Sequence, residues 1–502
     1  HSQPVIVTYD PAVSNGQYLF YVSSEGMLHA VDTANGKEKW AFMIEEALPK
    51  LGALRDDLVG EQVIVADMGP SVFLRDGDKD GEIADDVDDQ AILVFGQRRG
   101  GRALYALDIK NKDTPKLLWK IDNATTGFSE LGQTWSTPAF VKLRATTDPV
   151  IVFGGGYDPN QDNRPVAAAD TMGRALFVVN AVDGSLLKAF GTADGMAFSV
   201  PSDPAVLNSD LDAANFADRV YVGDTGGNVW RFDINDADPD NWVATHLADL
   251  SGADTPKRKI LFPPAAVKQL FISDRFDAVY IGTGDRENPL NAVSNDMMFM
   301  IKDREIGLSS KQNGSCDAGD LDPDCPIVFG TSSLLDITDN QLQIDLLLGS
   351  PAEQTNAQNQ LLSTDGWVLR LGIPSPPAAF PGFAAEKVTN PPQVFGNVLS
   401  FATFTPVEAL NACTPPGTGK LYLVNALNGG VIDIDKDGQI DPNTDTRTVS
   451  SFYVQGYVSP GSVIVRGGKI IQLHAGGALL HGRQVGTVGG GSRVYWYQEP
   501  EN

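Results

Sequence analysis

A short unit of strand, turn and strand recurs along the chain and limits the folds that the chain can adopt. Residues 18–42, YLFYVSSEGMLHAVDTANGKEKWAF, alternate apolar and polar side chains around the turns SEG and NGK. This pattern is typical of antiparallel β-hairpins. Similar units follow as AILVFGQRRGGRALYALDI, PVIVFGGGYD with GRALFVVNAVDGSLLKAF, RVYVGDTGGNVWRFDI, AVYIGTGDRENP with DMMFMIKD, STDGWVLRLG, GKLYLVNALNGGVIDI and SRVYWYQE.

Repeats of this kind, with few helix-length periodic runs, predict a β-propeller, in which small twisted sheets pack face to face. If the last strand pair completes the first blade, about seven blades result. We therefore predict an all-β fold: a modified, about seven-bladed β-propeller with loop insertions. It would form a single domain over residues 1–502, with blades over about 18–497. A β-sandwich array or two unrelated β domains is the alternative. The repeated tryptophans are expected to pack between blades, namely Trp40, Trp119, Trp230 and Trp367.

The charge balance narrows the range of partners. The chain has 64 acidic and 38 basic residues and a formal net charge of −26 at pH 7. Nucleic acid is not expected as a partner, because phosphate binding needs a basic face. No apolar run approaches the roughly 20 residues that span a bilayer, so we do not expect a membrane-spanning protein. The chain starts at His1 without a visible signal peptide, which predicts a processed or trimmed fragment.

One acidic stretch, DIDKDGQIDPNTD at residues 433–445, predicts a calcium site. Like charges at this density repel unless a cation lies among them. Positions 1, 3, 5, 7 and 9 of a calcium loop, with position 7 acting through its backbone carbonyl, are Asp433, Asp435, Asp437, Gln439 and Asp441. A glycine occupies the turn at position 6, but position 12 is a threonine rather than the glutamate of an EF-hand. The alternative is a solvated acidic turn.

A second stretch, DGDKDGEIADD at residues 76–86, repeats this opening. The ligands would be Asp76, Asp78, Asp80, the Glu82 carbonyl and, because position 9 is an alanine, Asp85 or the aspartate after it.

A third stretch, DLDAANFAD at residues 210–218, is a further calcium candidate. Asp210, Asp212 and Asp218 occupy positions 1, 3 and 9, and the Phe216 carbonyl would lie at position 7. Position 5 is an alanine, so a surface turn before a strand is the alternative.

The three cysteines suit an oxidising compartment. Cys316 and Cys325 flank DAGDLDPD and could form a disulfide, which would leave Cys413 unpaired. Pairing of Cys413 with one of them, or with a residue outside this chain, is the alternative. Extracellular calcium would suit loops that lack the glutamate at position 12. These features favour an extracellular protein.

Several stretches of the chain follow one another in a fixed order. This order is more specific for a protein family than any single hairpin is. The stretches are GMLHAVDTANGKEKWAF (26–42), GGRALYALDI (100–109), WSTPAFVKL (135–143), VIVFGGGYD (150–158), GRALFVVNAVDG (173–184), DRVYVGDTGGNVWRFDI (218–234), VYIGTGDREN (279–288), GWVLRL (366–371) and FATFTPVEALNACTPPGTGKLYLVNALNG (401–429). In this order, from about residue 18 to 497, they resemble the C-terminal propeller of the PilY/PilC family of type IV pilus tip and biogenesis proteins.

The resemblance implies a location at the cell surface, at the pilus tip, after export through the periplasm and outer membrane. It implies roles in pilus assembly, in the balance of extension and retraction that drives twitching, and in adhesion. The partners would be minor pilins and a surface or host-cell ligand. In the family a calcium loop precedes a YVYAGD-like strand; that slot is residues 210–218 here, where the alanine at position 5 departs from the pattern. The family's propeller usually follows an N-terminal adhesion region, so the chain is expected to be the C-terminal part of a longer precursor.

Two other classes of protein remain as alternatives. The stretch AVDTANGKEKW (30–40) fits the tryptophan-docking pattern of PQQ-type quinoprotein dehydrogenases, but that motif holds blades together and is not catalytic. The sequence contains no adjacent cysteine pair and no C-x-x-C-H haem site. We therefore expect a protein that is not an enzyme. A generic calcium-stabilised extracellular binding propeller is the third possibility.

Overall fold

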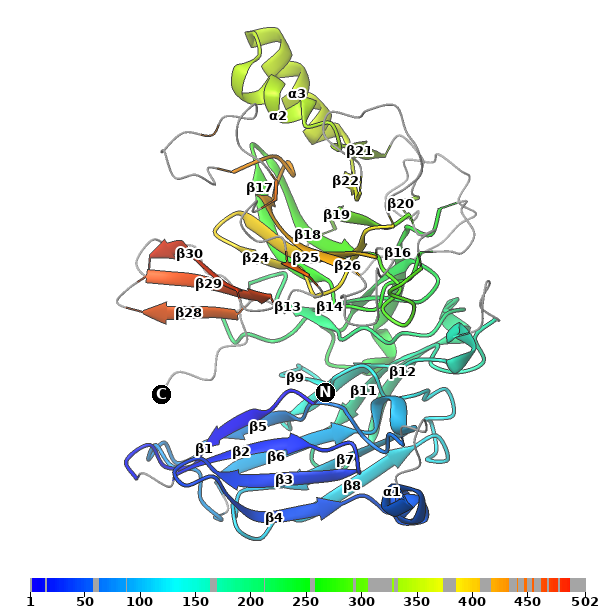
Figure 1. Cartoon of the computed structure of the whole chain (residues 1–502), viewed down its shortest axis with the longest axis vertical. Coiled ribbons are helices and arrows are strands. Elements are labelled where there is room, and N and C mark those ends of the chain that lie inside the picture. The colour runs from blue at the N-terminus through cyan, green and yellow to red at the C-terminus, as the bar shows by residue number, and fades with distance from the viewer. Residues whose placement is uncertain are drawn as a thin grey trace.

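The strands of the computed structural model form small sheets that follow one another in the order of the chain (Figure 1). The structure describes residues 2–13, 16–56, 63–86, 88–162, 169–211, 213–252, 258–291, 295–305, 327–328, 333–372, 385–406, 417–432, 440, 447–448, 454–455, 462–466, 469–476 and 479–487. The last four ranges are described by their backbone alone.

The first three sheets each contain four consecutive antiparallel strands. Sheet one comprises β1 (Val5–Thr8), β2 (Gln17–Val22), β3 (Met27–Asp32) and β4 (Lys37–Met43). Sheet two comprises β5 (Ser71–Arg75), β6 (Gln90–Gly96), β7 (Ala103–Asp108) and β8 (Lys116–Asp122). Sheet three comprises β9 (Ala139–Val141), β10 (Val150–Gly154), β11 (Leu176–Asn180) and β12 (Leu186–Phe190).

Sheets four and five each add a short parallel strand at one edge. Sheet four comprises β13 (Ala205–Leu207), β14 (Arg219–Gly223), β15 (Asn228–Asp233), β16 (Val243–Asp249) and the added β20 (Ile327–Val328). Sheet five comprises β17 (Ala265–Phe271), β18 (Asp274–Gly282), β19 (Met297–Asp303), β22 (Gly366–Arg370) and the added β21 (Leu334–Asp336).

The C-terminal part of the chain contributes two more sheets. Sheet six comprises β23 (Lys387–Val388), β24 (Gln393–Phe395), β25 (Val398–Pro406), β26 (Gly417–Asn425) and β27 (Val454–Gln455). Sheet seven comprises β28 (Ser462–Arg466), β29 (Lys469–Gly476) and β30 (Leu479–Thr487). The described part of the chain thus forms seven sheets, while the number of blades in the complete ring stays a prediction.

The first sheet begins earlier than the predicted start of the blades near residue 18. Val5 of β1 lies opposite Phe20 of β2, so a short N-terminal strand completes the four-stranded sheet. A strand from the C-terminus is therefore not needed to give this sheet its four strands.

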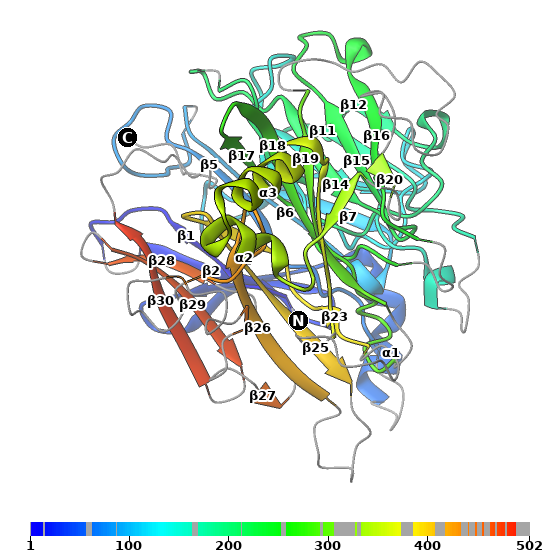
Figure 2. The ribbon, with the colours of Figure 1, turned by 90° about the horizontal axis from the view of Figure 1, so that it is seen from above.

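Helical segments lie in the connections between strands. Two longer helices, α2 (Gln341–Leu348) and α3 (Pro351–Ser363), are inserted between β21 and β22 and project from one end of the molecule (Figures 1 and 2). Ser350 starts α3 with a capping box: its hydroxyl accepts the Glu353 N–H at 3.4 Å, and the Glu353 carboxylate accepts the Ser350 N–H at 2.7 Å. The remaining helical segments are α1 (Leu51–Asp56) and the 3₁₀ turns η1 (Glu45–Lys50), η2 (Arg98–Gly100), η3 (Pro159–Asp162), η4 (Thr192–Asp194) and η5 (Pro239–Asn241).

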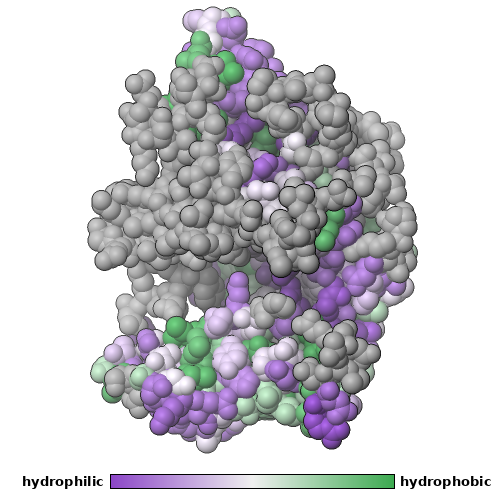
Figure 3. All heavy atoms as spheres, in the orientation of Figure 1, coloured by the Kyte–Doolittle hydropathy of each residue, from purple (hydrophilic) through white to green (hydrophobic). Residues whose placement is uncertain are grey.

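The surface of this helical insertion mixes polar and apolar residues. Leu347 and Leu348 at the end of α2 are 44 % and 58 % exposed. Hydrophobic residues lie between hydrophilic ones at the projecting helices in Figure 3. Among the described residues, no helix is long and apolar enough to cross a bilayer.

The hydrophobic core is divided into layers between consecutive sheets. Five buried clusters each draw side chains mainly from one sheet and the next, from sheets one and two to sheets five and six. Residues that share a cluster across these five interfaces are Phe20 and Phe95, Leu104 and Phe177, Val178 and Phe232, Tyr221 and Phe299, and Tyr280 and Phe401. Each inner sheet is therefore covered on both faces, which is the packing of a propeller.

This two-sided burial explains the sequence of the inner strands. In β10, VIVFG, every residue is buried, and the same holds for β11, LFVVN. A strand with both faces covered reads as a continuous apolar run. The outer strand β4, KEKWAFM, keeps most of its residues exposed.

Three of the predicted tryptophans bridge one sheet to a turn of the next sheet. The indole N–H groups donate to backbone carbonyls: Trp40 to Lys112 at 2.7 Å, Trp119 to Ala181 at 2.8 Å and Trp367 to Leu427 at 3.1 Å. Trp230 differs. Its ring packs in the cluster between sheets three and four, but its indole N–H donates at 2.9 Å to Asp224 of its own sheet.

Candidate calcium loops

The connection between β5 and β6 brings three predicted ligands together. One carboxylate oxygen each from Asp76, Asp78 and Asp80 lies within 4.8 Å of the other two. Asp76 is half-buried, whereas Asp78 and Asp80 are exposed. Alternate side chains of a five-residue segment thus converge on one point, and hard carboxylate oxygens are the ligands that calcium prefers.

The loop curls around these carboxylates through its own backbone. The two oxygens of Asp76 accept the N–H groups of Lys79 at 2.6 Å and Gly81 at 2.9 Å. Asp80 accepts the N–H of Glu82 at 2.8 Å. Gly81 has a φ of +90°, a conformation that glycine adopts without strain. The glycine predicted for the sharp turn is therefore where the turn occurs.

Asp89 holds the two ends of this loop together. It is buried, and its carboxylate accepts the N–H of Gly77 at 2.9 Å and of Ala84 at 2.8 Å. Asp89 was not among the predicted ligands. The sequence feature that could have identified Asp89 is its position immediately before the apolar run of β6, where a side chain turns towards the interior.

The two other predicted ligands lie as follows. Asp85 is exposed, and its carboxylate accepts a hydrogen bond from Asn111 at 3.2 Å and lies 3.8 Å from the Lys116 ammonium. Glu82 is exposed and was expected to contribute its carbonyl rather than its side chain. Within the described residues, the cluster of candidate ligands contains Asp76, Asp78 and Asp80 but neither of these two.

The pKa values of the loop reflect its crowded charge. The Glu82 pKa is raised, first by the charge of Asp10 and then by burial and by Asp80 and Asp78. The N–H of Asp80 favours the ionised form of Asp78, but burial and nearby carboxylates outweigh it and raise the Asp78 pKa. Burial opposes ionisation of Asp76, yet the N–H groups of Gly81 and Lys79 lower its pKa. A divalent cation would relieve the remaining repulsion.

The stretch 210–218 has a different arrangement. Asp218 is buried, and its carboxylate accepts the N–H groups of Ser209 at 2.6 Å and Asp210 at 2.8 Å. Burial raises the Asp218 pKa. Asp210 is exposed and lies 3.5 Å from the guanidinium of Arg144. Asp212, the predicted position 3, lies outside the described residues.

Two cations lie beside the side chain of Phe216, the residue whose carbonyl was the predicted ligand. The ring of Phe216 lies 4.7 Å from the Lys142 ammonium and 4.9 Å from the Arg144 guanidinium. Lys142 also donates to the Ala214 carbonyl at 3.1 Å. A metal in this loop would therefore share its surroundings with two positive side chains.

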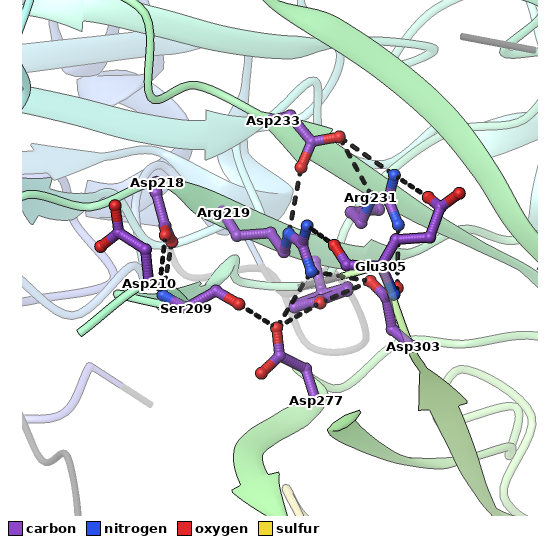
Figure 4. A network of polar contacts seen from close by, with 10 residues as sticks. Ser209, Asp210, Asp218, Arg219, Arg231, Asp233, Asp277, Asp303 and Glu305 are labelled. Atoms are coloured by element: carbon purple, nitrogen blue, oxygen red, sulfur yellow. Dashed lines mark hydrogen bonds and ion pairs between the residues drawn. The ribbon is translucent and has the colours of Figure 1, made fainter. Parts of the chain in front are cut away.

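A buried ion-pair network joins sheets four and five beside the same stretch (Figure 4). Its two arginines, Arg219 and Arg231, are at most 2 % exposed. Arg219 pairs with Asp233 and Asp277, both at 3.0 Å, and with Asp303 at 3.3 Å; Arg231 pairs with Asp233 at 3.1 Å, Asp303 at 2.9 Å and Glu305 at 2.7 Å. The hydroxyl of Ser209 donates to Asp277 at 2.5 Å and so links the start of the loop to this network.

This network was not predicted from the sequence. The sequence feature that could have indicated it is one arginine in each of two largely apolar strands, RVYVG and NVWRFD. A guanidinium buried in a core requires hydrogen-bonded anions around it. The anions come from β15, β18, β19 and the segment that follows β19, and only the fold brings them together.

The strongest sequence candidate, 433–445, lies almost wholly outside the described residues, including Asp433, Asp435, Asp437, Gln439 and Asp441. Its flanks are well anchored. Gln343 of α2 donates to the Val431 carbonyl at 2.7 Å, and Arg447 donates to the carbonyls of Gly429 and Thr338, both at 2.9 Å. The three cysteines, and with them the predicted disulfide, also lie outside the described residues.

Sheets of antiparallel strands that pack each on the next define a β-propeller, here with acidic loops between its strands. Residues 10–255 match the family model described as the PilY1 beta-propeller domain. The resemblance predicted from the ordered motifs is therefore confirmed.

The similarity to known proteins extends beyond the matched segment. The chain is 26 % identical over 528 residues to the type IV pilus biogenesis factor PilY1 of Pseudomonas aeruginosa (strain UCBPP-PA14), covering 91 % of this chain and 42 % of that protein. A PilY1 homolog of Xylella fastidiosa is 26 % identical over 459 residues, covering 87 % of this chain and 28 % of that protein. The chain thus spans less than half the length of these relatives.

A solved structure supports the fold. The crystal structure of the Pseudomonas aeruginosa PilY1 C-terminal domain superposes with a TM-score of 0.62 at 17 % identity, covering 92 % of this chain and 91 % of that one. The predicted all-β propeller is therefore confirmed.

Proposed function

We propose that this chain is the calcium-binding propeller of a type IV pilus assembly and tip protein, located outside the cell and without catalytic activity. The observation that carries the calcium assignment is the convergence of Asp76, Asp78 and Asp80 on one point of an exposed loop. The pilus assignment is supported by relatives that are named type IV pilus biogenesis factors. We propose both the calcium site and the pilus role for this chain.

Calcium would act by ordering an acidic loop. Ordering the backbone costs roughly 1–2 kcal/mol per residue, and repulsion among Asp78, Asp80 and Glu82 adds to this cost. A bound cation removes the repulsion and stabilises the folded state by RT ln(1 + [Ca]/Kd), about 2.7 kcal/mol at a hundredfold excess over Kd. The loop would then present a defined surface outside the cell and lose it when calcium is withdrawn.

The calcium proposal is tested by titration of the chelator-treated chain. Asp80→Asn removes one converging carboxylate, so we expect one calcium-binding event fewer by calorimetry and a smaller rise in melting temperature with calcium. Asp88→Asn is the matched control, because Asp88 is exposed in the same loop and lies outside the cluster of candidate ligands. Equal stoichiometry for Asp80→Asn and wild type would show that this loop does not hold the metal.

The role in pilus assembly is tested in a bacterium that produces the protein. We propose that its partners are minor pilins at the pilus tip and a surface or host-cell ligand. Loss of surface pili and twitching on deletion, together with co-purification of minor pilins with the intact protein, is the expected result. Normal piliation after deletion would contradict the pilus role even if calcium binding is measured.

A further inference from the structure

A cluster of charged and aromatic side chains joins sheets that are not neighbours in the chain. Arg99, between β6 and β7 of sheet two, forms an ion pair with Glu287, between β18 and β19 of sheet five. It also pairs at 3.1 Å with Asp162, which follows β10 of sheet three. Because sheets three and four separate sheets two and five along the chain, the Arg99–Glu287 pair crosses the middle of the ring. We call Arg98, Arg99, Trp135, Asp162, Arg286 and Glu287 the ring-centre cluster.

Two of the three arginines in the ring-centre cluster are neutralised. Arg98 pairs with Asp67 at 3.1 Å, and its guanidinium lies 4.7 Å from the centre of the Trp135 ring. Arg99 has its pairs with Asp162 and Glu287 and lies 5.3 Å from the same ring. These two side chains are largely covered, with 15 % and 32 % of their surface exposed.

Arg286 has no such partner. Among the described residues, its guanidinium forms no hydrogen bond and no ion pair, and it lies 5.5 Å from the centre of the Phe262 ring. The residue is exposed to solvent. Burial by the surrounding protein and the positive charge of Arg98 nevertheless lower the Arg286 pKa. An arginine that lies on an aromatic ring near a second arginine, with no carboxylate in direct ion-pair contact, is an incomplete ion pair.

We propose that Arg286 is the anion-binding residue of a site at the ring centre that accepts a carboxylate group. The planar guanidinium fork matches a carboxylate with two parallel hydrogen bonds, and the Phe262 ring beside it leaves its outer edge open to such a partner. The incoming group would supply the missing counter-charge on the side where water now has access. The proposal does not depend on calcium binding.

The charges around Arg286 define the class of ligand. Glu287, Asp67 and Asp203 act on Arg286 without pairing with it, so the surroundings offer one unpaired positive charge among several carboxylates. A singly charged carboxylate balances that charge. The same acids would repel a doubly charged phosphate more strongly than a singly charged carboxylate. The net charge of −26 also disfavours diffuse attraction of anions, so carboxylate binding would be confined to this place.

The test measures binding of small probes to the full chain by saturation-transfer NMR and calorimetry at low salt. The probes are N-acetylglycine for a chain terminus, N-acetylaspartate N′-methylamide for an acidic side chain, and glucuronate for a sugar acid. We expect at least one of them to bind, and Arg286→Gln to weaken that binding at least tenfold. The amide N-acetylglycinamide is the uncharged counterpart and should not bind. The carboxylate that binds most tightly identifies the kind of molecule that supplies the natural ligand.

Two controls separate the site from general charge effects. Arg275→Gln removes an exposed arginine of β18 and should leave binding unchanged. The melting temperature of Arg286→Gln should stay close to that of wild type, because no direct ion pair is lost and the relief of repulsion from Arg98 offsets the lost attraction of Glu287, Asp67 and Asp203. The proposal is overturned if none of the carboxylates binds, if binding survives Arg286→Gln, or if inorganic phosphate binds more tightly than every carboxylate.

Discussion

At the scale of single residues, burial and hydrogen-bond donors decide what each of the many carboxylates does. Asp78 and Asp80 are exposed and free to receive a cation. Asp224, in the turn between β14 and β15, is fully buried and accepts N–H groups from Gly226, Asn228 and the Trp230 indole at 2.9 Å each. The same side chain is thus a candidate ligand in one place and a structural acceptor in another.

Asp224 predicts a pH dependence of stability. Burial raises the pKa of Asp224 to about 6, compared with 3.8 in the unfolded chain, and so outweighs the hydrogen-bond donors, which lower the pKa. The folded state therefore holds the proton more tightly, so this contribution to stability is fully present below about pH 3.8 and is lost as the pH rises through about 6. In Asp224→Asn this component is absent. The free energy of unfolding, measured with urea between pH 4 and 7, should fall less steeply in the variant.

The variant should also be less stable at neutral pH. Asparagine places an N–H₂ group where the indole of Trp230 and the Asn228 amide now donate, which leaves a buried donor unpaired at a cost of about 1–3 kcal/mol. Asp203, whose pKa is also about 6, is unchanged in both proteins and contributes equally to both slopes. Parallel pH profiles for variant and wild type would contradict this assignment.

At the scale of elements, a turn of one sheet packs closely against a tryptophan of the preceding sheet. Gly184 in the turn between β11 and β12 has a φ of +75°, and a Cβ there would lie 2.9 Å from the Trp119 ring. Gly36, in the corresponding turn of sheet one, has a φ of +69° and open space around it. Both turns need the left-handed conformation, but only the turn of sheet three also needs the absence of a side chain.

This pair of glycines predicts a graded loss of stability. Gly36→Ala should cost about 1 kcal/mol, the penalty for placing an L-residue in this conformation. Gly184→Ala should cost about 1–3 kcal/mol more, because Trp119 must shift and stretch its hydrogen bond to Ala181. Equilibrium unfolding with urea measures both. Equal losses would show that the Trp119 ring moves aside without cost.

At the scale of the whole molecule, the interface between sheets four and five combines an apolar cluster with the Arg219–Arg231 network. At three other interfaces a tryptophan of one sheet donates a hydrogen bond to the next sheet. Removal of one partner from a buried network leaves an uncompensated charge, which is far more costly than loss of a surface pair. The stability of the interface between sheets four and five therefore depends on charge neutralisation.

Arg231→Met tests this interface. Loss of the guanidinium leaves Asp303 and Glu305 without it, and we expect the free energy of unfolding to fall by about 3–5 kcal/mol. Arg55→Met is the control: Arg55 pairs with Asp56 at 2.8 Å but is 79 % exposed, so the change should stay within about 0.5 kcal/mol. A loss as small as that of the control would mean that the network contributes no net stability.

Local patterns were sufficient to predict several elements and one site. The strands β2, β3 and β4 follow from the alternation and turns of residues 18–42, because side chains of a strand point to opposite faces in turn. Asp76, Asp78 and Asp80 converge because alternate residues of a tight loop face its centre. The helix α3 was not predicted, although Ser350 and Glu353 show the spacing of a capping box.

Contacts between residues close together in the chain thus account for the strands and turns that could be predicted and for the acidic loop at Asp76. Which buried charges meet follows only from the packing of the sheets. Arg219 finds Asp303 in the next sheet, and Arg99 finds Glu287, 188 residues away, across the ring. Such pairs leave no periodic trace in the sequence, because their spacing is set by how the sheets pack and not by the geometry of any one strand or turn.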